Sequence, residues 1–179
     1  MYQEIERKLS ANQVQFIDMQ QEIAKQFGIL KPSMHQELVA YYYDNNLEYI
    51  RHRVGKDINE ITIKRGIDNK IRTEVDLLLT SESTTDDVYI FLALLGYSLN
   101  TVLHKNTIHI YTKNLQFSYS KIYDCDFNYL DTFLEIESKC SDLSTERQLE
   151  VVDLAVAHLQ HIFPSLSIVN QSLFQLYKK

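Results

Sequence analysis

The sequence predicts an α+β fold in which eight or nine antiparallel strands form a closed β-barrel, or tunnel, with helices packed outside. Segments rich in Tyr, Ile, Val, Thr and Phe recur along the 179 residues, and several alternate in polarity. Short polar connections at residues 44–46 and 66–69 are typical of hairpin turns. Because few helical segments interrupt the strands, a sheet that closes on itself is the simplest arrangement.

Each expected element has its own signal in the residue pattern. The strands combine β-branched or aromatic residues with polar flanks, and they cover residues 2–9, 35–43, 47–54, 58–65, 70–79, 97–105, 107–113, 115–122 and 131–139. The helices are expected from Ala11 to Phe27 with Ser10 as a candidate cap, from Thr84 to Leu95, from Ser144 to Ile162, and over residues 171–177.

Length and composition indicate one domain over residues 1–179, with 45% hydrophobic and 23% charged residues. No apolar run approaches the ~20 residues that span a membrane, and no signal-peptide pattern opens the chain. We therefore expect a cytoplasmic protein without a membrane partner. Cys125 and Cys140 have no metal-binding spacing, so free thiols are expected. The net charge of −6 argues against broad nucleic-acid binding.

Acidic side chains alternate on the first and last expected strands. Glu4, Glu6 and Lys8 share one face of the first strand, and Glu135 and Glu137 share one face of the last. Two carboxylate pairs beside an ammonium group are what a hard divalent cation and a polyphosphate require.

Basic side chains alternate on the strands between them. Arg51 and Arg53 share one face of their strand. On other strands, residues two apart also share a face: Thr62 with Lys64, Arg72 with Glu74, and Lys105 with Thr107. For any one strand, a solvent-exposed polar face is the ordinary interpretation. The joint pattern of acids on the outer strands and bases between them favours a charged lumen. Since such a lumen stabilises a fold poorly, function is the better reason for it.

These motifs, in this order, resemble the CYTH superfamily, or triphosphate tunnel metalloenzymes. The resemblance runs nearly end to end: Glu4-Ile5-Glu6-Arg7-Lys8, Tyr42-Tyr43-Asp44, Arg51-His52-Arg53, Thr62-Ile63-Lys64, Arg72-Thr73-Glu74, Lys105, and Phe133-Leu134-Glu135-Ile136-Glu137. It implies an eight-stranded antiparallel tunnel. It also implies that Mg²⁺ or Mn²⁺ binds Glu4, Glu6, Glu135 and Glu137, and that the triphosphate binds Lys8, Arg51, Arg53, Lys64, Arg72 and Lys105. Lys8, Lys105 and Glu74 would be the catalytic residues.

Two positions depart from the family pattern. Thr107 stands where the family usually has an arginine, and Cys125 stands where it usually has an aspartate. Elsewhere, Tyr41, Tyr42 and Tyr43 are expected to pack as an aromatic cluster. His104 and His109 lack a partner carboxylate or a metal spacing, so surface or packing roles are expected for both.

The resemblance leaves several functions open. Metal-dependent hydrolysis of inorganic triphosphate or of a small organic or nucleoside triphosphate is the leading prediction. A class IV adenylyl cyclase, which makes cyclic AMP and pyrophosphate from ATP, is the first alternative. An RNA 5′-triphosphatase is disfavoured by the acidic charge, and a non-catalytic triphosphate or nucleotide binder would fit the two departures. The only expected partner is a small triphosphate; a homodimer is compatible with the fold, but no residue demands it.

Overall fold

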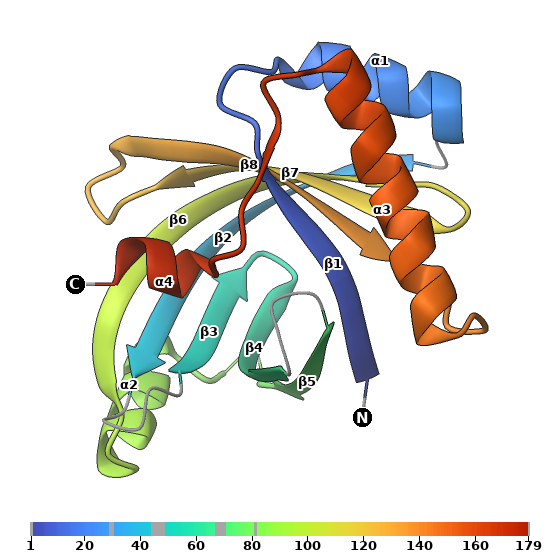
Figure 1. Ribbon diagram of the computed structural model, residues 1–179. Helices are drawn as coiled ribbons and strands as arrows, with labels where there is room; N and C mark the ends of the chain where they lie inside the picture. The colour runs from blue at the N-terminus through green and yellow to red at the C-terminus, as the bar shows by residue number, and fades with distance from the viewer. Residues whose placement is uncertain (1, 29–30, 44–48, 67–70, 81, 179) are drawn as a thin grey trace.

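The structure is a computed structural model that describes residues 2–28, 31–43, 49–66, 71–80 and 82–178, with side chains for all but 2–4, 31, 43, 64–66 and 71–74. These residues form nine strands and four helices (Figure 1). The strands are β1 (Tyr2–Ser10), β2 (Lys31–Tyr43), β3 (Tyr49–Gly55), β4 (Ile58–Gly66), β5 (Ile71–Leu78), β6 (Ser98–Tyr111), β7 (Leu115–Tyr123), β8 (Tyr129–Ser138) and β9 (Ser167–Ile168). The helices are α1 (Phe16–Phe27), α2 (Thr85–Leu94), α3 (Thr145–Ile162) and α4 (Leu173–Tyr177).

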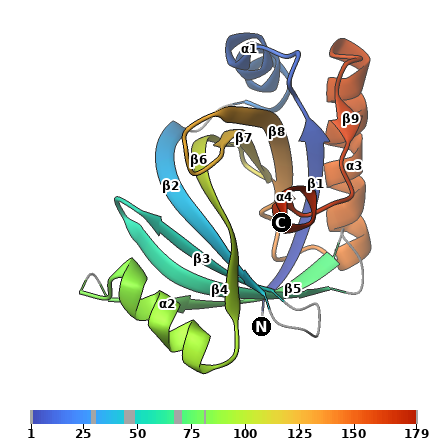
Figure 2. The ribbon, with the colours of Figure 1, turned by 90° about the vertical axis from the view of Figure 1, so that its left-hand side faces the viewer.

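The strands form one antiparallel sheet in the order β5-β4-β3-β2-β6-β7-β8-β1-β9. Strand β1 also pairs with β5, so it has partners along both edges. Its residues Tyr2–Ile5 pair with β5, whereas Glu6–Ser10 pair with β8. The turned view shows the strands curving around a central space (Figure 2). The expected α+β class and antiparallel pairing are confirmed.

The helices cover different parts of this sheet. Helices α1 and α3 pack on the outer face of β1, β7 and β8, where Ile23 and Leu159 are buried with Phe117. Helix α2 covers β2, β3 and β4 through Val88 and Leu92. Within the described residues, no helix combines the length and the apolarity that crossing a membrane requires.

Helix α4 packs among apolar side chains of the strands. Phe174 stacks on Tyr49 at a centroid distance of 4.8 Å and lies 6.0 Å from the ring of Tyr41. Leu173 belongs to the same buried cluster as Leu103. Tyr41 and Tyr42 are both buried, as expected, but they belong to separate apolar clusters and do not form one aromatic cluster. The side chain of Tyr43 lies outside the described part.

The element boundaries differ from the expected ones in several places; β2, for example, begins at Lys31 rather than at residue 35. Helix α1 begins at Phe16 rather than Ala11, because Asn12 accepts a hydrogen bond from the Thr132 amide at 2.6 Å and keeps the chain against β8. Ser10 therefore ends β1 and caps no helix. The two strands expected over 97–113 are one strand, β6, because Asn106 stays paired with both β2 and β7. The short strand β9 was not expected.

The start of α3 and the state of the two cysteines can also be compared with the structure. Helix α3 begins within one residue of the expected start, and the Ser144 hydroxyl caps it by accepting a hydrogen bond from the Arg147 amide. Both cysteines are free thiols, as expected. The hairpin turn predicted at 44–46 lies outside the described residues, as does most of the turn predicted at 66–69.

Candidate functional site

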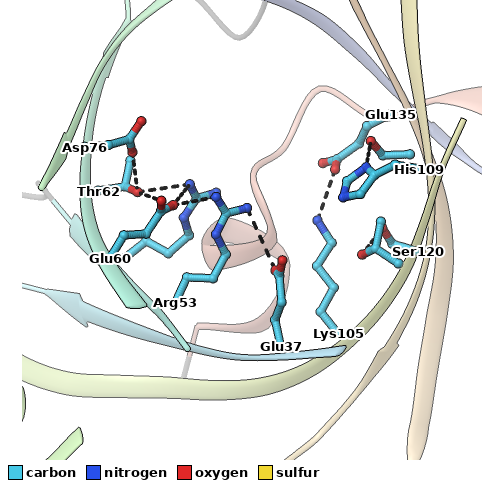
Figure 3. Close-up of polar contacts among 12 residues, drawn as sticks. Glu37, Arg53, Glu60, Thr62, Asp76, Lys105, His109, Ser120 and Glu135 are labelled. Atoms are coloured by element: carbon cyan, nitrogen blue, oxygen red, sulfur yellow. Dashed lines mark hydrogen bonds and ion pairs between the residues drawn. The ribbon is translucent and has the colours of Figure 1, made fainter. Parts of the chain in front are cut away.

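The inward side chains of the strands line a cavity of about 860 Å³. Because side chains on a strand alternate between faces, every second residue of β3, β6 and β8 reaches this space. The intervening residues face the helices, as Ile136 does from β8. Figure 3 shows labelled polar side chains from opposite walls pointing toward the same space.

Seven of the eleven predicted site residues line this cavity: Glu6, Lys8, Arg51, Arg53, Lys105, Glu135 and Glu137. The side chains of the other four, Glu4, Lys64, Arg72 and Glu74, lie outside the described part of the chain. For these four, the backbone register places Glu4 opposite Arg72 and Lys64 opposite Glu74.

Glu135 joins two lysines on one wall of the cavity. Its carboxylate lies 3.4 Å from Lys8 Nζ and 3.2 Å from Lys105 Nζ. Lys8 also donates to the backbone carbonyl of Gln171 at 3.5 Å, next to α4. One carboxylate therefore holds two ammonium groups that come from strands β1 and β6. We name Lys8, Lys105 and Glu135 the lysine wall.

Glu6 and Glu137 form an acidic pair beside the lysine wall. They occupy paired positions on β1 and β8, and both line the cavity. Glu137 also forms an ion pair of 2.7 Å with Lys139. Carboxylate oxygens are the ligands of Mg²⁺ and Mn²⁺, so the chemistry of this pair fits such an ion. Among side chains that the structure describes, no group of three acidic, histidine or cysteine residues is clustered closely enough to bind a metal.

The predicted arginines lie on a facing wall, where acidic residues hold them (Figure 3). Arg53 contacts Glu60 at 2.5 Å and Glu37 at 3.8 Å. Arg51 donates to the Thr62 hydroxyl at 3.1 Å and lies 3.7 Å from Glu60. Asp76 accepts a hydrogen bond from Thr62 at 2.7 Å. We name these residues the arginine wall: Glu37, Arg51, Arg53, Glu60, Thr62 and Asp76.

The acids of the arginine wall were not among the predicted site residues. Glu60 lies two residues before Thr62, and the alternation that places Thr62 and Lys64 on one face also places Glu60 there. Glu37 lies two residues before buried Val39 and reaches the same cavity. The strand pattern therefore contains a signal for Glu60 as well as for the basic residues.

Positive and negative side chains are balanced around the cavity. The described lining includes six basic residues, Lys8, Arg51, Arg53, Lys56, Lys105 and Lys139, and six acidic ones, Glu6, Glu37, Asp57, Asp76, Glu135 and Glu137. Within the described structure, the buried Nε of Arg53 has no hydrogen-bond acceptor. A buried donor without an acceptor is costly, so an anion at this position would be favourable.

The two positions that depart from the family pattern have local roles. Thr107 is buried and shares a hydrogen bond of 2.9 Å with Ser120 across β6 and β7. Cys125 is exposed in the turn between β7 and β8. Asp124 caps this turn by accepting hydrogen bonds from the amides of Asp126 and Asn128.

His109 lines the cavity, which corrects the surface or packing role expected for it. Its Nδ1 lies 2.8 Å from the Ser118 hydroxyl, and its ring lies 4.9 Å from that of His35. Burial, followed by the nearby positive charge of Lys105, lowers the pKa of His109 to about 4. His109 is therefore a neutral hydrogen-bonding group at pH 7. His104 instead stacks on exposed Phe127 at 3.8 Å.

No family model and no curated protein matches this sequence. Several solved structures resemble this chain in three dimensions. The PH1012 protein of Pyrococcus horikoshii superposes with a TM-score of 0.77 at 19% identity, over 98% of this chain and 99% of that one. A "putative adenylate cyclase" from Bacillus halodurans gives 0.65 at 13%, over 99% of each chain. The Mimivirus capping enzyme triphosphatase gives 0.54 at 11%, over 89% of this chain and 88% of that one.

These likenesses extend along nearly the whole chain and show a shared fold. At identities below 20% they do not fix the reaction or the substrate. The chemistry of this chain must therefore be argued from its own cavity.

Proposed function

We propose that this chain, which has the fold of the triphosphate tunnel metalloenzymes, hydrolyses a triphosphate bound between its lysine and arginine walls. The substrate would be inorganic triphosphate or a small organic or nucleoside triphosphate. One observation carries the proposal: Lys8 and Lys105, held by Glu135, face Arg53 across a single cavity. Cations on both sides suit an anion whose charge is spread over several phosphates.

The closed tunnel is part of this proposal. Pairing of β1 with both β5 and β8 supports it, because each edge of β1 then has a neighbouring strand. In such a tunnel, the side chains of Glu4, Lys64, Arg72 and Glu74 would add to the described walls. Glu74 would then orient the basic groups around the substrate.

Phosphoryl transfer depends mainly on positioning and on neutralising charge, because the phosphate oxygens repel a nucleophile. Lys8 and Lys105 would bind oxygens on one side, while Arg51 and Arg53 would bind those on the other. Glu135 fixes the two lysines before substrate arrives, which reduces the entropy cost of binding.

Glu6 and Glu137, with Glu4 and Glu135 as the further ligands that the family resemblance implies, would hold Mg²⁺ or Mn²⁺. When bound, the ion would neutralise phosphate oxygens and turn the balanced cavity into one with net positive charge. The acids of the arginine wall already neutralise part of the arginine charge. Binding a triphosphate in this cavity would therefore depend more on the charge of the ion than binding in a purely basic cavity would.

A class IV adenylyl cyclase is the second candidate. A cavity of about 860 Å³ lies within the roughly 300–1,000 Å³ of small-molecule pockets, so an organic group can accompany the phosphates. Two proteins of similar structure, from Bacillus halodurans and Vibrio parahaemolyticus, are each described as a "putative adenylate cyclase". In that reaction, a ribose hydroxyl rather than water would attack the α-phosphorus.

Phosphorus NMR separates these reactions directly. The protein would be incubated in turn with inorganic triphosphate, ATP and thiamine triphosphate, each with Mg²⁺ and with Mn²⁺. Orthophosphate as the new product supports the triphosphatase, and pyrophosphate with a cyclic nucleotide supports the cyclase. Binding without any product would instead indicate a non-catalytic triphosphate binder. A Lys8→Met/Lys105→Met variant serves as the control for contaminating phosphatases.

A further inference from the structure

The outer surface of α2 and the adjoining strands present many exposed apolar side chains. Only Val88 and Leu92 of α2 are buried against the sheet. Leu94 is 83% exposed and Leu77, on β5, is 58% exposed. We name this surface the α2 face; it consists of Ile63, Val75, Leu77, Tyr89, Ile90, Phe91, Leu94, Leu95 and Leu99.

These side chains lie on one side of the molecule. Strand register places Leu77 beside Ile61, and Ile61 packs in the buried cluster that contains Val88 and Leu92 of α2. On the other side of this cluster, Leu99 pairs with Tyr42. Both ribbon views show α2 on the outside of the strands, away from α1 and α3 (Figures 1 and 2).

The α2 face is larger than the apolar surface of an ordinary monomer. A large side chain presents roughly 150–250 Å² when fully exposed. At exposures of 39–83%, the nine side chains together present on the order of 1,000 Å². The largest apolar patch of a typical monomer is about 300–600 Å², whereas a stable protein interface buries about 800 Å² on each partner.

We propose that the α2 face is the interface of a two-fold symmetric dimer of this chain. A two-fold interface uses the same surface on both copies, and a surface this large and apolar supplies the area that each copy needs. A helix that is apolar on all sides is normally buried, and the sheet covers only one side of α2. Ile90 and Leu94 lie one turn apart on its exposed side, as packing between two copies of the helix requires.

The charges near α2 favour a second copy over an anionic membrane. The helix contains Asp86 and Asp87 and no lysine or arginine. Membrane-bound helices usually carry basic residues that attract anionic lipids, so this helix has the wrong charge for such a surface. In an antiparallel pair of α2 helices, the two acidic ends would lie at opposite ends of the interface and would not repel each other.

Sedimentation equilibrium of the full chain tests the dimer. We expect a mass of about twice 21.1 kDa at micromolar concentration. An Ile90→Lys/Leu94→Lys variant should weaken self-association at least 100-fold and sediment as a monomer. The matched control is Leu154→Lys, which changes an exposed leucine on α3 and should leave the dimer intact. Leu77→Lys tests the same face from β5 without altering α2, because Leu77 pairs with Ile61 on the side of the sheet that α2 covers.

Several outcomes would overturn the proposal. A wild-type chain that sediments as a monomer up to 100 µM has no such interface. A dimer that survives both the α2 double variant and Leu77→Lys, each with a native circular dichroism spectrum, uses another surface. Flotation of a monomeric wild-type chain with phosphatidylcholine vesicles would assign the α2 face to a lipid surface instead.

Discussion

Glu6 lies directly opposite Glu137 on the paired strands β1 and β8, and both carboxylates line the same cavity. Like charges at opposite positions of paired strands destabilise a sheet by roughly 0.2–1 kcal/mol. A divalent cation between them would reverse this effect. We therefore propose this pair as the position of the metal ion, with Lys139 offsetting part of the charge of Glu137 before the ion binds.

The first prediction is that Mn²⁺ stabilises this protein and that Glu6→Gln removes the effect. At 100 times its Kd, a ligand adds about 2.7 kcal/mol to the free energy of unfolding. For a chain of this size, that corresponds to a rise in Tm of roughly 5–10 °C. The variant should lose most of this rise. Differential scanning calorimetry with and without Mn²⁺ measures both, and it requires no substrate.

Glu150→Gln is the matched control, because Glu150 pairs with Arg147 on the exposed surface of α3. It should keep the full response to Mn²⁺. An equal rise in Tm for wild type and Glu6→Gln would remove the metal site from these strands.

The candidate site could be predicted from sequence to the extent that strand alternation determines it. Alternation predicted that Arg51 and Arg53 share a face and that Glu135 and Glu137 share another, and all four line the cavity. It could not predict which walls face each other, because that depends on how the sheet curves. The pairing between Arg53 and Glu60 was missed for another reason: they are direct partners in the β3–β4 hairpin, and that register depends on the turn between Gly55 and Ile58.

The fold was predictable at the level of element types and less so at their ends. The bounds of α3 were predicted to within one residue, because the signals that start and end this helix are contiguous in sequence. The start of α1 was not, because it is set by Asn12 binding to β8 more than one hundred residues away. The role of His109 was missed for a similar reason, since its partners come from other strands.

The second prediction concerns Lys105. Lys105→Met should lower kcat/KM for the triphosphate substrate by about 10–100-fold, because a hydrogen bond to a charged group contributes about 1.5–3 kcal/mol. Steady-state phosphate release measures the change. Lys121→Met changes an exposed lysine on β7 and should leave kcat/KM unaltered. Comparable losses in the two variants would show that general surface charge, rather than the lysine wall, attracts the substrate.

The third prediction concerns the acids that hold the arginines. Without ligand, Glu60→Gln should lower the free energy of unfolding by about 1–3 kcal/mol, because it leaves the partly buried charge of Arg53 without its main partner. Inorganic triphosphate should then stabilise the variant more than the wild type, since its oxygens replace the lost carboxylate. Thermal unfolding in EDTA, with and without triphosphate, measures both effects without turnover.

Glu37→Gln provides the comparison for Glu60, because Glu37 lies farther from Arg53, at 3.8 Å. Its effects should have the same signs and smaller magnitudes. If triphosphate stabilises Glu60→Gln less than it stabilises the wild type, the arginine wall does not bind the phosphates.

The fourth prediction is that His109 makes stability depend on pH. Its pKa in the folded protein is about 4, below the ordinary value of 6.5, because burial and the charge of Lys105 disfavour the protonated ring. Between these two values the unfolded chain binds more protons than the folded chain. The contribution of His109 is therefore fully present above pH 6.5 and is lost as the pH falls toward 4. It amounts to at most about 3 kcal/mol.

His109→Gln should reduce the loss of stability between pH 7.5 and pH 5, as measured by urea unfolding at both values. Some loss should remain, because burial also lowers the pKa of His52, which acts in the same direction. His161→Gln, an exposed position in the last turn of α3, should behave as the wild type. Equal pH dependence in wild type and His109→Gln would mean that the ring can be protonated in the folded cavity as readily as in the unfolded chain. His109 would then carry a positive charge near pH 5 and could bind phosphate there, instead of remaining a neutral hydrogen-bonding group.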